Sequence, residues 1–516
     1  MHPLHHAASH PEKAACILAE TGAVLTYGDL DRASNRGAHL LRSLGLTRGD
    51  VVAVMLDNET AVFEIAWAAQ RTGVYLTSIS TRLSAADTAY ILADSDARLL
   101  IVSDRLAPLA TQALESLPQV IGYTVSAATD GFGSWQQSSS SHPDTRITDE
   151  SPGTDMLYSS GTTGRPKGVK PQLPEGALDA DVPLSAMGRT LYGMNEESIY
   201  LSTSPLYHAA PLRWAMTVQR LGGTVVIMAK FDAEQALRFI QDYRITHATW
   251  VPTHFIRLLK LPEAVRSRYR HDSLRAVIHA AAPCPIPVKL AMIDWWGPIV
   301  HEYYSGTETC GITALTSQEW LERPGSVGRA VLGVARIVGE DGRELVPGQT
   351  GDVYFSDGPK FDYHKDPEKT AKAHDERGWA TLGDIGYLDE NGYLFLTDRR
   401  NFMIISGGVN IYPQEIENLL ITHAKVEDVA VIGEPDDEMG ENVIAVVQPA
   451  LGVTADDSLA RELHDFTRAA LGGVKTPRRF DFRAELPREP TGKLFKAKII
   501  AEYRAHAERS QVQSKH

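Results

Sequence analysis

One stretch in the first third of the chain combines the groups that bind polyphosphates. It runs from Tyr158 to Lys170, reads YSSGTTGRPKGVK, and holds three glycines, four aliphatic hydroxyls and three cations. Glycines let backbone N–H groups approach an anion, hydroxyls donate hydrogen bonds, and lysine supplies a point charge. The stretch does not match the Walker pattern. Because Gly/Ser/Thr runs are also typical of ordinary surface loops, composition alone supports a phosphate site and a plain loop equally.

Length and charge set the class of protein. A chain of 516 residues is too long for one hydrophobic core and predicts two or more domains. The hydrophobic fraction of 43% and charged fraction of 22% are typical of globular proteins. The net charge of −14 disfavours nucleic acid as a partner. An anionic cofactor is still compatible, since a local basic loop outweighs net charge at short range.

Cysteine usage and the chain start indicate a cytoplasmic location. Cys16, Cys284 and Cys310 match no zinc or redox spacing, and three thiols make a poor disulfide framework. No apolar run reaches the roughly 18 residues of a membrane span. The first fifteen residues lack the apolar segment of a signal peptide. We therefore expect no membrane span and leave open whether the chain forms a homo-oligomer.

The elements that must position the loop alternate between strand and helix. Buried strands are expected at Val51–Leu56, Leu99–Val102, Thr224–Met228, Ala248–Val251 and Ala276–His279, and helices at Glu64–Arg71, Ala85–Asp94, Ala233–Tyr243 and Thr253–Leu259. This alternation predicts βαβ units with largely parallel sheets. The Ser- and Gly-rich segment Ser126–Pro143 is expected to be a surface connection.

The pattern changes twice in the last third of the chain. From about Val331, short strands joined by Asp341-Gly342 and Asn391-Gly392 predict a β-rich lobe. After Asp398, mixed strands and helices predict a compact unit large enough to be a domain. The expected fold is therefore α/β: residues 1–397 form a large N-terminal domain of βαβ sheets plus a small β lobe, and residues 398–516 form a small, mobile α+β domain.

The Tyr158–Lys170 stretch resembles the phosphate-binding signature of the adenylate-forming superfamily. This superfamily contains acyl-CoA synthetases, the adenylation domains of peptide synthetases, and luciferases. Further motifs follow in the family's order over almost the whole chain, and the resemblance is strongest to bacterial acyl-CoA ligases of the fatty-acid and coumarate type. It implies that the phosphates of ATP are bound by Ser159, Ser160, Gly161, Thr162, Thr163, Gly164 and Lys167.

Two further motifs imply the nucleotide contacts. The segment YYSGTE at 303–308 resembles the family's aromatic-Gly-x-Thr-Glu element, with its glycine displaced by one place to Gly306. The resemblance implies that Tyr303 and Tyr304 lie against adenine, that Thr307 contacts the α-phosphate, and that Glu308 holds Mg²⁺. The small residues before it, of which Ala281, Ala282 and Pro283 are assigned to the adenine site, resemble the family's stretch that passes close to the base.

The ribose and hinge motifs carry two departures from the family pattern. Asp384 ends a segment that resembles the Thr-Gly-Asp element with one residue inserted or exchanged, and the resemblance implies that it accepts the ribose hydroxyls. Asp398 and Arg399 match the hinge dipeptide, and Arg399 is implied to reach the ribose or α-phosphate. Phe402 stands where the family usually has an acidic residue, so part of the hinge polarity is expected to differ.

The last motifs imply a reaction in two steps. Gly407 and Gly408 belong to a segment that closely matches the family's glycine loop, which lines the pantetheine channel in the second step. Lys493 stands in the family's C-terminal lysine motif and is implied to bridge the carboxylate and the α-phosphate in the first. The implied catalytic groups are therefore Lys493, Thr307, Glu308 and Lys167.

The sequence limits the identity of the substrate acid but does not determine it. His208 matches a position that gates the acyl pocket in the family, although a structural histidine fits the pattern nearly as well. The resemblance implies that the small residues Ala209, Ala210, Ala281 and Ala282 line the acyl pocket, and Gly306 is also assigned to the acid. Because no Asp stands in these stretches to pair with an ammonium group, a fatty, aryl-propenoic or polycyclic acid is favoured over an amino acid. ATP, Mg²⁺ and coenzyme A are the expected cofactors, CoA being favoured because no carrier domain follows His516. The alternatives are a stand-alone adenylation enzyme that loads a carrier protein and a catalytically silent nucleotide-binding homologue.

Overall fold

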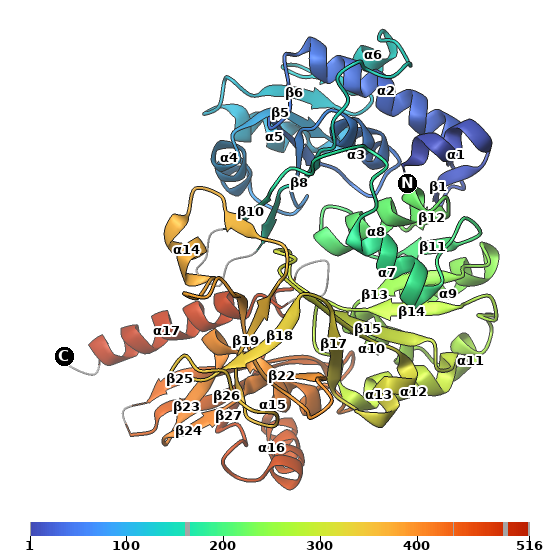
Figure 1. Cartoon of the computed structure of the whole chain (residues 1–516). Coiled ribbons are helices and arrows are strands. Elements are labelled where there is room, and N and C mark those ends of the chain that lie inside the picture. Colours follow the sequence, from blue (N-terminus) through green and yellow to red (C-terminus); the bar gives the residue numbers. More distant parts are fainter. Residues whose placement is uncertain (1, 160–165, 437, 489–493, 514–516) are drawn as a thin grey trace.

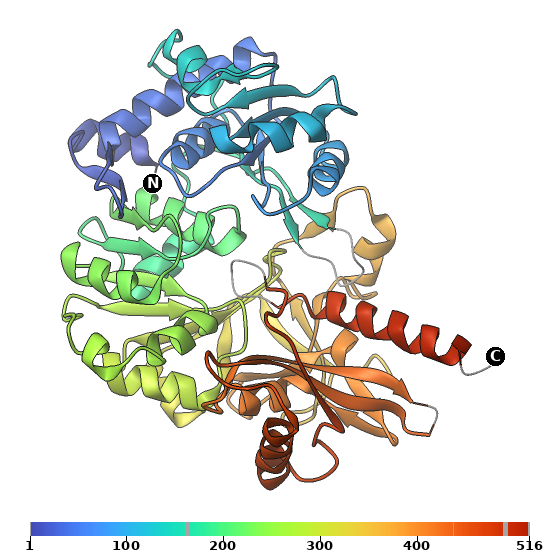
Figure 2. The same cartoon turned by 180° about the vertical axis from the view of Figure 1, so that it is seen from behind.

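The computed structural model describes residues 2–159, 166–436, 438–488 and 494–513, with side chains described up to residue 505. Of the predicted site residues, Ser160, Gly161, Thr162, Thr163, Gly164 and Lys493 lie outside the described residues. The N-terminal third builds one end of the molecule, the middle third builds a large sheet, and the C-terminal unit lies at the opposite end (Figures 1 and 2).

The N-terminal third is a six-stranded parallel sheet. Its strand order is β7-β6-β5-β3-β4-β8, formed by Gly133–Ser134, Ile121–Thr124, Ala97–Val102, Val51–Met55, Tyr75–Ser78 and Thr154–Asp155. Strand β3 is buried along its whole length, as expected where helices cover both faces. Val52 and Val54 face the core shared with α2 (Tyr27–Ser43) and α3 (Ala61–Arg71). The alternating residues face α4 (Ala85–Asp94) and α5 (Ala107–Leu114).

The middle of the chain forms a thirteen-stranded mixed sheet. Its order is β18-β19-β21-β22-β17-β16-β15-β14-β13-β11-β12-β1-β2. One half of this sheet consists of β1 (Ala14–Leu18), β2 (Val24–Thr26), β11 (Ile199–Ser202), β12 (Thr224–Ile227), β13 (His247–Trp250) and β14 (Ala276–His279). The other half consists of β15 (Val300–Tyr304), β16 (Ile312–Leu315), β17 (Ser326–Leu332), β18 (Val334–Val338), β19 (Gly351–Ser356), β21 (Ala380–Leu388) and β22 (Leu394–Arg399).

Helices also cover both faces of the parallel part of this sheet. One face packs on α7 (Pro183–Tyr192) and α8 (Ala209–Arg220). The other packs on α9 (Ala233–Asp242), α10 (Pro252–Leu259) and α12 (Ile286–Trp296). The remaining helices of the first 400 residues are α1 (Pro3–Ser9), α6 (Trp135–Ser140), α11 (Glu263–Arg266), α13 (Ser317–Glu322) and α14 (Pro367–Lys372). The predicted α/β class with parallel βαβ units is confirmed.

The C-terminal unit is a five-stranded sheet with three helices. Its strands are β23 (Ile404–Ser406), β24 (Val409–Ile411), β25 (Val426–Asp436), β26 (Gly440–Pro449) and β27 (Arg479–Phe482). One face packs on α15 (Pro413–Leu420) and α16 (Asp457–Leu471), and the other packs on α17 (Lys496–Gln513). The predicted boundary at Asp398 falls at the end of β22, beside this unit.

The expected β-rich lobe is continuous with the parallel sheet, because β16 and β17 pair. One local expectation needs correction. The segment Ser126–Pro143 is not only a surface connection, since it contains β7 and α6. Trp135 at the start of α6 is 1% exposed and lies against the helix position of Gly37, so one large apolar residue anchors an otherwise polar segment.

Candidate active site

The carboxylate of Asp384, in the large sheet, contacts two other predicted nucleotide residues, Tyr304 and Arg399. Asp384 in β21 and Arg399 in β22 are register partners, and Arg399 Nε donates to Asp384 Oδ1 at 3.1 Å. Tyr304 Oη donates to Asp384 Oδ2 at 2.6 Å. Asp384 is only 6% exposed, and its charge raises the pKa of Arg399. Each carboxylate oxygen has a second lone pair, so the group can still accept hydrogen bonds from a diol.

The two tyrosines of the YYSGTE motif face opposite ways. Because side chains alternate along a strand, β15 sends Tyr304 to Asp384 and Tyr303 into the core. Tyr303 is 9% exposed, and its hydroxyl accepts a hydrogen bond from Trp214 Nε1 at 3.2 Å. Of the two predicted adenine contacts, only Tyr304 therefore lies with the other nucleotide residues.

The predicted adenine stretch follows β14, the strand next to β15. His279 and Glu302 are register partners, so the chain leaving β14 lies beside Tyr303 and Tyr304. Ala281 is exposed and has φ of 74°, a left-handed conformation that costs a residue with a Cβ about 1–3 kcal/mol. Ala282 is half-buried and Pro283 is exposed. Strain of this kind concentrates at functional sites, which fits a surface shaped for a ligand.

Glu308, Tyr363 and Lys167 form a second group. Tyr363 Oη donates to Glu308 Oε1 at 2.8 Å, and Lys167 Nζ lies 5.2 Å from the centre of the Tyr363 ring. Burial and the nearby Glu308 raise the pKa of Tyr363, which keeps its proton on the hydroxyl. Burial, together with Lys369, lowers the pKa of Lys167. The group thus places a carboxylate at the hydroxyl of one phenol and a cation over its ring.

The displaced glycine of the motif has a steric explanation. A Cβ at Gly306 would lie 2.7 Å from Glu308 Oε2 and 2.8 Å from Leu382 Cδ2. The hydroxyl of Ser305, the residue in the family's usual glycine position, instead donates to the Gly311 carbonyl at 2.8 Å. A side chain at this position would therefore require the ends of the Glu308 and Leu382 side chains to shift.

Both ends of the phosphate-type stretch are held by a hairpin. Strand β9 (Leu157–Ser159) pairs with β10 (Lys167–Pro171), and Ser159 and Lys167 are register partners. Strand β10 also pairs with β20 (Phe361–Tyr363), which brings Tyr363 to this sheet. The hairpin therefore delivers Lys167 to the Glu308 group.

The predicted acid-gate residues begin helix α8. His208 is the N-cap residue, and Ala209 and Ala210 form the first turn, all three being half-buried. One turn later, Arg213 donates to the Thr307 carbonyl at 3.3 Å. The start of α8 consequently lies beside the Thr307 turn.

The hinge and glycine-loop residues separate in this structure. Asp398 Oδ2 accepts a hydrogen bond from the Gln414 backbone N–H at 3.0 Å, which supplies a capping acceptor to the first turn of α15. Gly407 and Gly408 form the β23–β24 turn, where Gly407 N–H donates to the Met439 carbonyl at 2.8 Å. This contact lies within the C-terminal unit, and the β23–β24 hairpin lies at the edge of that unit away from β8 and β10 (Figure 1).

Phe402 lies beside a buried lysine–glutamate pair of the C-terminal unit. Lys496 Nζ lies 5.2 Å from the centre of the Phe402 ring and 2.6 Å from Glu417 Oε1. Glu417 Oε1 also accepts from the Val431 N–H at 2.7 Å. The hinge thus uses a lysine between an aromatic ring and a buried carboxylate.

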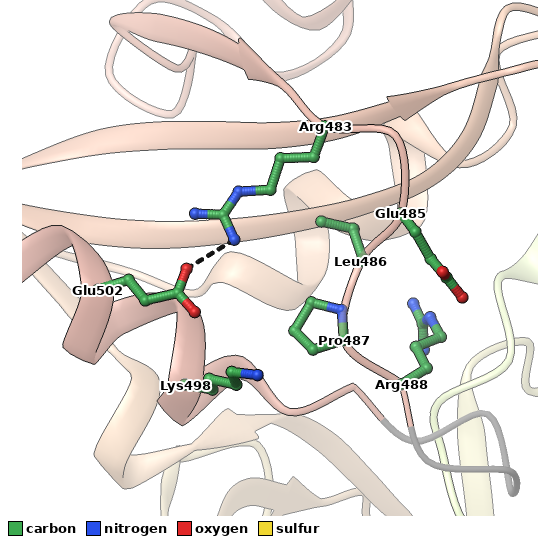
Figure 3. Close-up of a pocket in the computed structure, with 7 residues that line it drawn as sticks. All are labelled: Arg483, Glu485, Leu486, Pro487, Arg488, Lys498 and Glu502. Atoms are coloured by element: carbon green, nitrogen blue, oxygen red, sulfur yellow. Dashed lines mark hydrogen bonds and ion pairs between the residues drawn. The ribbon is translucent and has the colours of Figure 1, made fainter.

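A small cavity of about 330 Å³ lies next to the predicted lysine motif. It is lined by Arg483, Glu485, Leu486, Pro487, Arg488, Lys498 and Glu502 (Figure 3). Arg483 donates to Glu502 at 2.8 Å, as Figure 3 shows, and Arg488 NH2 donates to Asp428 Oδ1 at 2.6 Å. Its arginines are thus engaged by carboxylates of this unit.

The two units also touch through charged pairs. Lys260, which follows α10, donates to Glu427 Oε2 at 2.8 Å and to the Val426 carbonyl at 3.1 Å. Arg400 binds both oxygens of Asp352 at 2.6 and 2.7 Å. These exposed or half-exposed pairs hold the two units in their present orientation. Such pairs are weak, so breaking them costs little free energy.

The described residues hold no group of three or more metal-binding side chains. Glu308 therefore offers one carboxylate, which fits a hard cation that takes its other ligands from phosphate oxygens and water. Within the same residues, no helix has the length and apolarity to cross a membrane.

Comparison with known families decides the assignment. The AMP-binding enzyme family matches residues 4–360, and the AMP-binding enzyme C-terminal domain matches residues 415–493. The chain belongs to the AMP-binding enzyme family. The superfamily and the enzyme class predicted from the motifs, an AMP-forming acid–thiol ligase, are confirmed.

Relatives with assigned activities match almost end to end. The fatty acid–[acyl-carrier-protein] ligase ScoC of Streptomyces coeruleorubidus is 34% identical over 95% of this chain and 94% of its own. The long-chain-fatty-acid–CoA ligase FadD13 of Mycobacterium tuberculosis is 30% identical over 96% of both chains. The ATP-bound structure of MatB from Rhodopseudomonas palustris is 26% identical, with a TM-score of 0.83 over 98% of this chain and 99% of MatB.

Three residues with contacts at or near the candidate site were not predicted from the sequence. Tyr363 and Arg213 belong to none of the motifs, and nothing in the sequence around them distinguishes them from ordinary surface residues. Lys496 lies three positions after Lys493, and the sequence does not reveal that it pairs with Glu417. Each is recognisable only when strands or helices distant in sequence are brought together.

Proposed function

We propose that this chain is an ATP-dependent carboxylic acid–CoA ligase. It would convert a hydrophobic acid to an acyl-AMP with release of pyrophosphate, and then transfer the acyl group to the thiol of CoA. The observation that carries the proposal is that Tyr304 and Arg399 both bind Asp384, and that Arg399 lies close enough to Glu308 and Lys167 of the second group to interact with them electrostatically. An adenylating site requires a carboxylate that can bind the ribose next to a group of residues that can bind the phosphates.

The first step must bring two anions together. The acid's carboxylate oxygen attacks the α-phosphorus, a P–O bond forms, and the bond to pyrophosphate breaks. Lys167, the Thr307 hydroxyl and Arg399 would offset the repulsion, and Lys493 would join them from the C-terminal unit. Such fixed charges and donors are the main source of catalysis in phosphoryl chemistry.

Glu308 would hold Mg²⁺ together with phosphate oxygens of ATP. The bound ion would neutralise charge on the phosphates and on the leaving pyrophosphate. The Tyr363 hydroxyl donates a hydrogen bond to Glu308 Oε1 and so orients the carboxylate before a cation binds. Gly306 keeps Oε2 clear of a side chain.

The second step needs a different face of the C-terminal unit. The CoA sulfur attacks the acyl carbon, and AMP leaves with the electron pair of the broken C–O bond. We infer that the small domain (398–516) turns about Asp398 so that Gly407 and Gly408 replace Lys493 at the site. The surface pairs Lys260–Glu427 and Arg400–Asp352 are weak enough to break in such a turn.

The acid is inferred to be hydrophobic and to carry no charged group besides its carboxylate. Helix α8 begins with small residues, and it continues with Trp214, which is fully buried against Tyr303. Two of the relatives named above, ScoC and FadD13, are named as ligases of fatty acids, which supports a fatty acid as the first candidate.

A carrier protein is the second candidate for the acceptor. The observation in its favour is the 34% identity to a fatty acid–[acyl-carrier-protein] ligase, which exceeds the identity to FadD13. A catalytically silent homologue is the third candidate, and the intact Asp384 and Glu308 groups speak against it.

Pyrophosphate release separates the three. Wild-type protein is assayed with ATP, Mg²⁺ and a panel of fatty, aryl and polycyclic acids, and the thioester is then sought with CoA and with holo-acyl-carrier protein. A CoA thioester supports the proposal, and a thioester on the carrier alone selects the second candidate. Background pyrophosphate release across the panel would leave only the silent homologue.

A further inference from the structure

Arg213 on helix α8 connects two parts of the molecule that are distant in sequence. Its Nε donates to Asp155 Oδ2 at 2.7 Å, and its NH1 donates to Thr309 Oγ1 at 2.9 Å. NH1 and NH2 both donate to the Thr307 carbonyl at 3.3 Å. Among the described residues, one guanidinium therefore binds a carboxylate, a hydroxyl and a backbone carbonyl at once.

The groups that Arg213 joins belong to different sheets. Asp155 ends β8 in the six-stranded sheet, two residues before β9 and the phosphate-type stretch. Thr307 and Thr309 lie in the turn between β15 and β16 of the thirteen-stranded sheet. Figure 1 shows α8 near the place where the two sheets meet. Arg213 thus fixes the spacing between the strand that enters the phosphate stretch and the turn that carries Thr307 and Glu308.

The turn needs such support because its backbone is unusual. Thr309 has φ of 54°, a conformation that a β-branched residue rarely adopts. The side chains of Arg213 and Asp155 are 27% and 15% exposed, so their contact is partly shielded from water. A lysine could keep the charge opposite Asp155 but has no planar fork to reach the carbonyl and the hydroxyl together.

We propose that Arg213 is a positioning residue for adenylation, with Asp155 orienting its guanidinium. It acts through Thr307 and Glu308, whose placement relative to the phosphates it sets. The role in turnover rests on the proposed function, whereas the role in shaping the nucleotide site can be measured without turnover.

The test compares Arg213→Lys, Arg213→Ala and Asp155→Asn with wild type. The matched control is Arg32→Ala, which removes an exposed Arg32–Asp29 pair of 2.7 Å on α2. Four quantities are measured: kcat and KM for pyrophosphate release, the Kd of α,β-methylene-ATP with Mg²⁺, and the melting temperature. Guanidinium at about 50 mM is added to each variant as a rescue test, well below the molar concentrations that unfold proteins.

We expect Arg213→Lys to lose about 10- to 100-fold in kcat, the scale on which a small misplacement of reacting groups acts. Its analogue Kd should rise about tenfold, while its melting temperature stays close to that of Arg32→Ala and wild type. Guanidinium should partly restore Arg213→Ala and leave wild type unchanged. Asp155→Asn should resemble Arg213→Lys, and the double variant should be no worse than either, because both changes break one connection.

Wild-type kcat and Kd in Arg213→Lys would overturn the proposal, since charge alone would then suffice. Losses that follow the melting temperature without guanidinium rescue would reduce Arg213 to a stability role. If wild type releases no pyrophosphate with any acid, the proposed function fails, and the analogue Kd then decides about Arg213 by itself. Failure of wild type to bind the analogue would overturn both.

Discussion

Tyr363 donates a hydrogen bond to Glu308 Oε1 at 2.8 Å, and the two residues are 55 positions apart in the sequence. The contact joins the β15–β16 turn to the three-stranded sheet that carries Lys167. A carboxylate that is already oriented needs little reorganisation when a cation and phosphates arrive, which is the basis of electrostatic preorganisation.

We first predict the consequences of breaking this contact. Glu308→Gln removes the charge and should lower kcat for pyrophosphate release by about a hundredfold, the effect of losing one preorganised group. Tyr363→Phe keeps the charge and should cost about tenfold, as expected for one hydrogen bond to a charged group. A Mg²⁺ titration of the rate distinguishes them, because only Glu308→Gln should need much more Mg²⁺. Equal Mg²⁺ dependence in both variants would argue against Glu308 as the metal-binding carboxylate.

The second prediction concerns the ribose. Asp384→Asn leaves Tyr304 and Arg399 facing an amide, so we expect KM for ATP to rise about tenfold or more, since a charged group in a hydrogen bond is worth about 1.5–3 kcal/mol. KM for the acid should change little. The control is Glu344→Gln, which removes the charge from a 2.9 Å pair with Arg336 on β18 of the same sheet and should leave KM for ATP unchanged. A larger effect on KM for the acid than on KM for ATP would contradict the assignment of Asp384.

The sequence predicted which residues belong to the candidate site better than it predicted which way their side chains face. Asp384, Arg399 and Glu308 came from motifs whose order is local in the chain, and the structure brings them together with Lys167. Tyr303 was assigned to adenine with Tyr304, but strand alternation sends it to Trp214 in the core. A motif read as letters does not state which face of β15 each tyrosine occupies.

Long-range pairings account for most of what the sequence did not reveal. Tyr363 reaches Glu308 because β20 pairs with β10, and Arg213 reaches Asp155 because α8 lies between two sheets. No spacing rule links such residues. Trp135 was missed for a related reason, since the polar composition of its segment concealed one deeply buried side chain.

The third prediction is a pH dependence of stability. Burial lowers the pKa of His254 from 6.5 to about 3, so the folded protein keeps this ring neutral. The unfolded chain binds a proton below pH 6.5, and the free energy of unfolding therefore falls as pH drops from 6.5 towards 3, by about 1.4 kcal/mol per pH unit for this group. His301, whose pKa burial lowers to about 4, acts in the same direction.

His254→Gln should therefore reduce the slope of unfolding free energy against pH between pH 6.5 and pH 5, even though the variant is less stable at pH 7. The slope is obtained from urea midpoints at several pH values. Thr203→Val is the matched control, because it removes the 3.2 Å contact with His254 Nδ1 and leaves the imidazole in place. An unchanged slope in His254→Gln would show that this ring titrates alike in the folded and unfolded chain.

The final prediction separates the two half-reactions. Lys493→Ala should lower acyl-AMP formation by at least about a hundredfold, because the lysine would stabilise charge only in that step. It should leave thioester formation from a preformed acyl-AMP and CoA largely intact, since Gly407 and Gly408 would then occupy the site. Lys498→Ala is the control, because this exposed lysine lies in the first turn of α17 and should affect neither step. Equal losses in both steps would contradict a turn of the small domain about Asp398, and would place Lys493 at the site throughout the reaction.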